Sequence, residues 1–398
     1  MEDPSVRRFV KDYVHDVINN SIQKALIHVT AGGSQPHDND VAMTQTMTSD
    51  RIQGPCDVMT HVDVIDSFAG VLARDCIQGG LDRVLHRSLT GKRILCVGSV
   101  CLELNTVCDK YPDEDTKTLV DEHYWSLGGN AANTATVLAY LGARTEFMGT
   151  LVKSKTLDFL LNEFKESGVS FENCAYLNGE KHKSATSILL ISKASKTCTT
   201  LSDYHGITEL SFKQFYTLNL QHYRWIHFEG RVNNRDIPLM VDKLERYNSE
   251  QDKDKRISVS MEINHPHALC PGLTELFPKV DVIFISKEYA LDSGCVNKED
   301  AVQRLFPQCR RGASLFCTWG EQGAAAISTQ GAFSSPAFQP ESVADTKGAG
   351  ATFNAAVLFA LTSGAAVEEA LVFASKIAGA KCEYRGFQCV RQIRQHFT

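Results

Sequence analysis

From Arg93 onward, short apolar runs alternate with longer stretches of helical periodicity, and this alternation limits the possible folds more than any other feature. The apolar runs lack polar alternation, which is typical of strands that helices cover on both faces. The clearest are 94–97, 225–228, 257–259, 282–285 and 315–317. The pattern predicts βαβ units, and hence an α/β fold with a central, mostly parallel sheet between helices.

Two further segments have a different composition. Residues 186–192 and 197–201 are rich in β-branched residues and flank the short polar stretch 193–196. This arrangement favours an antiparallel hairpin. Such a hairpin could form a small β-lid, or an edge that pairs with a second subunit.

The sequence divides into four regions. Residues 1–29 carry an amphipathic helical stripe, and residues 30–60 are polar, lack an apolar period and are expected to form a flexible linker. Residues 61–90 carry a second amphipathic helical stripe, and residues 91–398 form the α/β domain.

Composition excludes several classes of protein. With 41 Lys and Arg against 47 Asp and Glu, the chain lacks the basic surplus of a nucleic-acid binder. No apolar run reaches the length of about 18 residues that spans a bilayer. The first 20 residues contain four acidic residues, unlike a signal or transit peptide.

Thirteen cysteines without a C-x-x-C pair indicate reduced core thiols, with neither a disulfide framework nor a zinc site. We therefore expect a cytoplasmic protein.

The most informative segment is 345–354, in which Gly348, Ala349 and Gly350 lead into a strongly helix-forming run. Backbone N–H groups at such a helix start point outward at the positive end of the helix dipole, where they can hold a phosphoryl group. Taken alone, the three residues could equally be an ordinary turn into a helix.

Residues 345–353 resemble D-T-x-G-A-G-D-T-F, the C-terminal signature of the ribokinase (PfkB) family of carbohydrate kinases. A second family motif is recognisable where Gly129, Asn130 and Asn133 open a helix. The resemblance implies that these three residues contact the sugar, with the amide side chains on one helix face. Asn130 could instead cap the helix, or do both.

Further local matches occur in order along residues 93–391 and are closest to the ketohexokinase branch of the family, which phosphorylates fructose at O1. They lie at 94–98, 107–112, 225–231, 286–287, 317–319, 378–382 and 386–387. The resemblance implies a ribokinase-like fold, ATP and Mg²⁺ as cofactors, a fructose-like sugar as substrate, and a homodimer formed through the β-lid.

The resemblance also implies a nucleotide site. Trp319, Glu321 and Gly323 are similar to the adenine-side loop, and Arg231 to an arginine near the phosphates. Alternatively, Gly323 only turns the chain and Arg231 lies on the surface. The ATP-binding residues implied are Arg231, Trp319, Glu321, Gly323, Gly348, Gly350 and Cys382.

The chain departs from the family at two positions of the site. Ala351 stands where the family has the aspartate that takes the proton from the sugar hydroxyl, and alanine has no acceptor atom. A positioned general base contributes about 10²–10⁴-fold, so we expect strongly reduced turnover. Asp345 begins the same motif, but we do not expect it to substitute. Glu103 stands where ketohexokinases have an aspartate that bonds sugar hydroxyls.

Two functions therefore remain open. The first is a ketohexokinase-like enzyme impaired at Ala351. The second is a pseudo-kinase that binds sugar or ATP and acts as a scaffold through its N-terminal helices. The stripe in residues 1–29 resembles the helices by which anchoring proteins bind protein kinase A regulatory subunits. The alternative is that both helices pack on their own kinase domain or on a twin subunit.

Overall fold

The computed structural model describes residues 91–195, 197–203, 206–231, 235–265, 272–340 and 343–397. The described residues up to His396 belong to one compact unit. The two amphipathic helices and the linker predicted within residues 1–90 lie outside the described residues, so those expectations stay predictions.

An eight-stranded sheet forms the centre, in the order β14-β13-β12-β11-β10-β9-β1-β4. The six strands from β12 to β4 pair in parallel, and β13 and β14 add an antiparallel edge. All five apolar runs predicted as strands are strands of this sheet. The strands are β1 (Arg93–Val97), β4 (Thr145–Met148), β9 (Tyr223–Glu229), β10 (Ser258–Ile263), β11 (Val282–Ile285), β12 (Ser314–Thr318), β13 (Ala324–Ser328) and β14 (Gly331–Ser335).

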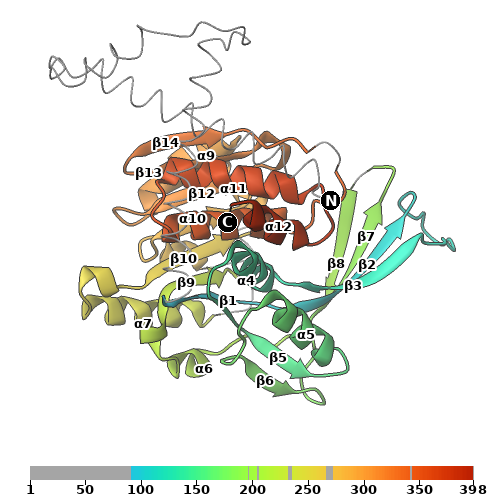
Figure 1. Ribbon diagram of the computed structural model, residues 1–398, viewed down its shortest axis with the longest axis horizontal. Coiled ribbons are helices and arrows are strands. Elements are labelled where there is room, and N and C mark those ends of the chain that lie inside the picture. The colour runs from blue at the N-terminus through green and yellow to red at the C-terminus, as the bar shows by residue number, and fades with distance from the viewer. Residues whose placement is uncertain are drawn as a thin grey trace, which may run out of the picture. The chain divides into compact units, whose positions relative to one another are not determined.

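Helices cover both faces of this sheet (Figure 1). On one face, side chains of α7 (Ile237–Ser249), α8 (Lys287–Asp292) and α9 (Lys298–Leu305) share a core with the sheet, and α6 (Phe212–Tyr216) joins them. On the other face, α4 (Asn130–Leu141) packs against α10 (Ala349–Thr362), which packs against α11 (Val367–Lys381). The remaining helices are α5 (Leu157–Ser167) and α12 (Gln388–Phe397).

Strand β10 shows how the two faces differ. Val259, Met261 and Ile263 belong to the core shared with α7, α8 and α9. Successive strand residues point to opposite faces, so Ser260 and Glu262 point toward α4 and α10. The layer that contains both predicted helix starts therefore receives polar as well as apolar side chains.

A second, four-stranded sheet projects from the body, at the right of Figure 1. The predicted hairpin is confirmed as the antiparallel pair β7 (Thr186–Ser192) and β8 (Thr197–Asp203). The sheet also contains β2 (Cys101–Cys108) and β3 (Glu122–Gly128), in the order β3-β2-β7-β8. We call these four strands the lid. A separate parallel pair joins β5 (Thr150–Lys153) and β6 (Ala175–Asn178).

The lid has two chemically distinct faces. Its register aligns Glu103 with Ser126 on β3 and Ser187 on β7, which makes one face polar. The adjacent row lies on the opposite face and is apolar, since one residue further along each strand reverses the face. This row consists of Trp125, Leu104, Ile188 and Leu201.

Within the part of the chain that the structure describes, no helix has the length and apolarity needed to cross a bilayer. The ten cysteines described are all unpaired, and most of them are buried.

Candidate active site

The start of α10 offers an open set of backbone N–H groups. Gly348 is the N-cap, with φ of 72°, and the first turn contains no acidic side chain. A Cβ on Gly348 would lie 2.5 Å from the ring of Phe387, so only glycine fits there. A Cβ on Gly350, by contrast, would meet no protein atom within 4 Å. The helix start is therefore closed behind Gly348 and open at Gly350, as an anion site requires.

The loop before α10 is held by a buried ammonium group. Lys381, only 1% exposed, donates to Asp345 Oδ2 at 2.9 Å, to the Asp345 carbonyl at 2.8 Å and to the Lys347 carbonyl. The Asp345 carboxylate also accepts from the backbone N–H groups of Lys347 and Gly386. Asp345 thus supports the loop, in line with the expectation that it does not act as a base.

Ala351 lies in the first turn of α10 and is buried. Its methyl group offers no proton acceptor. Asn354, one turn further along α10, is also buried and donates from Nδ2 to Glu262 Oε2. The helix face that begins at Ala351 therefore reaches a carboxyl group on β10.

The start of α4 supplies the predicted sugar-contacting residues. Gly129 is the N-cap with φ of 99°, and a Cβ there would overlap the Ser99 carbonyl oxygen. Asn130 is the first helical residue and makes no capping bond, so the alternative that it caps α4 is wrong, because glycine alone tolerates that backbone angle. Asn133 is buried, and its Oδ1 has no hydrogen-bond partner among the described residues.

Glu103 is not free to meet a ligand. It accepts from Ser126 Oγ at 3.1 Å and forms an ion pair with Lys347, whose ammonium also contacts Ser126 Oγ at 2.7 Å and Asn105 Oδ1 at 3.3 Å. Burial raises the pKa of Glu103, and the Lys347 ammonium opposes that rise. The sequence analysis missed this pair. A charged residue at the variable position of the phosphate-loop motif was its only sequence signal.

Arg231 is 7% exposed, so the alternative that it lies on the surface is wrong. It pairs with Glu209 at 3.0 Å and with Glu229 at 3.2 Å, and these two carboxylates balance its charge inside the fold. Glu229 in turn accepts from the backbone N–H groups of Ser99 at 2.8 Å and Ala131 at 3.1 Å, which fixes the start of α4.

A cavity of about 170 Å³ adjoins the start of α10. It brings together Gly323, Ala349 and Gly350, which were predicted from separate parts of the sequence. Trp319, Glu321 and Cys382 do not line it. Trp319 is buried beside it, and the Cys382 carbonyl instead accepts the N–H groups of residues 344 and 345.

Gly323 itself has φ of 88°, and a Cβ there would overlap the Ser335 carbonyl oxygen. The turn therefore requires glycine whether or not a ligand is present.

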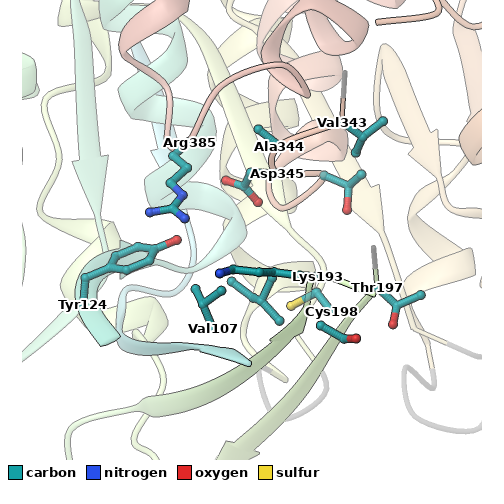
Figure 2. Close-up of a pocket in the computed structure, with 12 residues that line it drawn as sticks. Val107, Tyr124, Lys193, Thr197, Cys198, Val343, Ala344, Asp345 and Arg385 are labelled. Atoms are coloured by element: carbon teal, nitrogen blue, oxygen red, sulfur yellow. The ribbon is translucent and has the colours of Figure 1, made fainter. Parts of the chain in front are cut away.

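A second cavity, of about 180 Å³, lies between the lid and the loop before α10 (Figure 2). In the figure, Tyr124 and Cys198 of the lid face Arg385 and Asp345 across the opening. The Arg385 guanidinium lies 5.7 Å from the Tyr124 ring and 2.5 Å from Glu122, so it bridges the body and the lid. This cavity is also lined by Ala344 and Thr346 of the loop that precedes Lys347.

Among the described residues, no three His, Cys, Asp or Glu side chains gather as a metal cage. Mg²⁺ is usually held by one or two carboxylates together with substrate phosphates and water.

Comparison with known proteins places this site in a family. Residues 92–392 match the pfkB family of carbohydrate kinases, and the chain belongs to that family. It is 37% identical to ketohexokinase of Mus musculus over 297 residues, which cover 74% of this chain and 98% of the relative. It is 24% identical to ribokinase of Bacillus subtilis (strain 168) over 303 residues, 72% of this chain and 92% of the relative.

Solved structures confirm the ribokinase-like fold. Ribokinase of Giardia lamblia superposes with a TM-score of 0.64 at 15% identity, covering 77% of this chain and 98% of that one. Ribokinase of Arabidopsis thaliana, determined with ribose and ATP, gives a TM-score of 0.59 at 16% identity with the same coverage.

Proposed function

We propose that this chain is an ATP-dependent sugar kinase that phosphorylates fructose, or a closely similar ketose, to its 1-phosphate at a reduced rate. The observation that carries the proposal is the open N-terminus of α10, whose Gly350 lines the cavity of about 170 Å³ together with Gly323 of the loop that resembles the adenine side of the family's site. The mouse relative is named for this activity. The helix starts of α4 and α10 supply the sugar-facing amides and the phosphate-facing N–H groups, respectively.

The chemistry follows from positioning and charge. The N–H groups at the start of α10 stabilise charge on the transferring phosphoryl group. Mg²⁺ bound together with ATP would supply positive charge that offsets the negative charge of the phosphates. Asn130 and Asn133 orient the sugar hydroxyls. Ala351 leaves the attacking hydroxyl without the usual acceptor, so the expected defect lies in kcat more than in nucleotide binding.

Lys347 adds a second cause of weak activity. Its ammonium already pairs with Glu103, the residue proposed to bond sugar hydroxyls. A sugar must displace this contact before it can use the carboxylate. The proposal therefore includes a raised KM for fructose.

The test is a coupled measurement of ADP release with fructose, on this chain and on its Ala351→Asp variant, together with calorimetric titration of each ligand. Absence of turnover in both proteins and of binding to either ligand would exclude the sugar-kinase function.

Gly350→Ala separates nucleotide binding from folding. A Cβ at this position meets no protein atom within 4 Å, so the melting temperature should stay within about 2 °C of the unsubstituted chain. In a nucleotide complex the methyl group would lie where a phosphate approaches the backbone, so the Kd for ATP should rise about tenfold or more. Gly364→Ala is the strain control: its φ of 93° should make alanine lower the melting temperature, but because it lies beyond the C-terminal end of α10 the Kd for ATP should not change. Unchanged ATP affinity in Gly350→Ala would place the phosphates elsewhere.

We further propose that the apolar row of the lid, Trp125, Leu104, Ile188 and Leu201, pairs two copies of the chain. Leu201 is 53% exposed, and Trp125 and Ile188 are also exposed. Large exposed apolar side chains aligned on one sheet face are typical of interfaces. Leu201→Glu should convert a dimer to a monomer in analytical ultracentrifugation, whereas Thr200→Glu, one residue away and therefore on the opposite face of the lid, should do so far less. A chain that is already monomeric would contradict the pairing.

The second candidate function is a pseudo-kinase scaffold, favoured by two observations together: Ala351 has no acceptor, and Lys347 already pairs with Glu103. In this case the helices expected in residues 1–29 and 61–90 recruit a partner, for example the regulatory subunit of protein kinase A. Capture of that subunit by the full chain, and loss of capture when residues 1–30 are removed, would support it. Ordinary kinase turnover by the unsubstituted chain would exclude it. For either function we propose a cytoplasmic location.

A further inference from the structure

Two glutamates lie side by side at the carboxyl ends of neighbouring strands, beneath the two helix starts of the site. Glu229 on β9 and Glu262 on β10 are register partners in the parallel sheet. Both are buried, and Glu262 is only 1% exposed. The sequence analysis singled out neither one for chemistry.

The two carboxylates differ in how their oxygens are satisfied. Glu229 Oε2 accepts from the N–H groups of Ser99 and Ala131, and its Oε1 accepts from Ser99 Oγ and Arg231. All of its contacts are structural. Glu262 Oε2 accepts from Asn354, but Glu262 Oε1 is buried without a hydrogen-bond partner among the described residues. A buried, unsatisfied oxygen is costly, and it needs an explanation in the native fold.

The position of Glu262 supplies that explanation. Its bonded neighbour Asn354 lies one helical turn after Ala351, on the same face of α10. The amide of Asn130, the first residue of α4, is close enough to affect its ionisation. The Glu262 carboxyl group therefore contacts the helix α10 that carries Ala351 and lies near the first residue of α4.

We propose that Glu262 Oε1 accepts the proton of the attacking sugar hydroxyl in this chain, in place of the carboxylate absent at Ala351. This role rests on the proposed kinase function and accounts for residual turnover. Glu262 is connected to the first turn of α10 through its hydrogen bond with Asn354, and its Oε1 is the oxygen that this bond leaves unused.

The ionisation of Glu262 is compatible with this role. Burial, and then the negative charge of Glu229, raise its pKa to about 8, while the amides of Asn264, Asn354 and Asn130 act in the opposite direction. The other titratable group beside it is the buried thiol of Cys96 on β1, whose pKa is raised. At pH 7 about a tenth of the chains would hold Glu262 ionised, and a base with a pKa near the working pH is the efficient one.

The proposed step balances in atoms and charge. The hydroxyl oxygen forms a bond to the γ-phosphorus of ATP while the bond from that phosphorus to the β–γ bridging oxygen breaks. ADP leaves with the electron pair of the bridging oxygen, and the hydroxyl proton passes to Glu262 Oε1. The resulting carboxylic acid then releases the proton to water.

The test combines a pH profile with a crossed pair of substitutions. In the unsubstituted chain, kcat should rise about tenfold per pH unit below pH 8 and level off above it, because only the ionised carboxylate accepts the proton. Glu262→Gln should lower kcat at pH 8 at least about tenfold and remove this rise, with the KM values for ATP and fructose changed by less than about threefold. Glu262→Asp should retain the pH dependence.

The same Glu262→Gln change in the Ala351→Asp background should cost much less, since the introduced aspartate then takes the proton. Equal losses of kcat in both backgrounds would show that Glu262 only supports the fold. A change in the Mg²⁺ dependence of the rate alone would show that Glu262 acts on the metal. Either result overturns the proposal. If Glu262→Gln does not fold, the pH profile of the unsubstituted chain decides alone, and a flat profile between pH 6.5 and 9 refutes the role. No turnover in Ala351→Asp would instead reject the kinase function itself.

Discussion

Ala351→Asp is expected to raise kcat for fructose by about 10²-fold, the lower end of the contribution of a positioned general base. The first turn of α10 is otherwise complete, with its glycine cap, open N–H groups and adjoining cavity. The gain in kcat falls at the lower end of this range because, in the unsubstituted chain, Glu262 is already proposed to accept the proton of the sugar hydroxyl. The measurement is the coupled ADP-release assay at saturating ATP, run at pH 7 and pH 8.

Ala351→Asn is the matched control. Asparagine has nearly the same size and shape as aspartate but cannot accept the proton, so kcat should stay within about threefold of the unsubstituted chain. A gain in Ala351→Asn equal to that in Ala351→Asp would mean that side-chain volume is the limiting factor. No gain in either variant would show that the catalytic position has been misplaced.

Lys381→Met is expected to lower the free energy of unfolding by about 3–5 kcal/mol, the range for breaking a buried ion pair. The ammonium is 1% exposed and is the partner of the Asp345 carboxylate and of two carbonyl oxygens. Its loss leaves a buried charge and two carbonyls without their donor. Urea unfolding followed by circular dichroism would measure the change, and ATP affinity should fall with it because residues 345–348 set the start of α10.

Lys255→Met provides the comparison, because Lys255 also pairs with an aspartate, Asp252, but both side chains are more than half exposed. Exposed pairs contribute little, so the change there should stay within about 0.5 kcal/mol. Adding Asp345→Asn to Lys381→Met should recover part of the lost stability by removing the uncompensated carboxylate. A Lys381→Met chain as stable as Lys255→Met would show that the loop does not depend on this ammonium.

The elements that could be predicted from the sequence are those that depend on a local pattern of residues. All five apolar runs are strands, the hairpin at 186–192 and 197–201 is present, and the glycine motif opens a helix. Strands β2 and β3 were not predicted, because polar residues interrupt both sequences, CLELNTVC and EHYWSLG, and neither forms an apolar run. The capping alternative for Asn130 failed because the backbone angle at Gly129 decides where α4 begins.

The polar partners of the site could not be predicted in the same way. Lys347 and Glu103 are separated by more than 200 residues. They meet only because the lid packs against residues 345–348, the loop before α10. Glu262 ends a strand whose other residues are mostly apolar, and the unsatisfied state of its Oε1 depends on side chains from β10 and α10. Contacts of this kind depend on tertiary packing, so the spacing of residues along the sequence does not predict them.

The Lys347 ammonium joins the lid to the loop before α10, and in the proposed kinase this contact would couple the binding of the two substrates. In that function, a sugar that draws Glu103 away from Lys347 would also release the loop proposed to receive the γ-phosphate. Thermodynamic linkage requires the converse: a nucleotide that shifts this loop changes the affinity for sugar by the same factor. The Lys347–Glu103 pair would therefore contribute to the coupling between the affinities for sugar and for nucleotide.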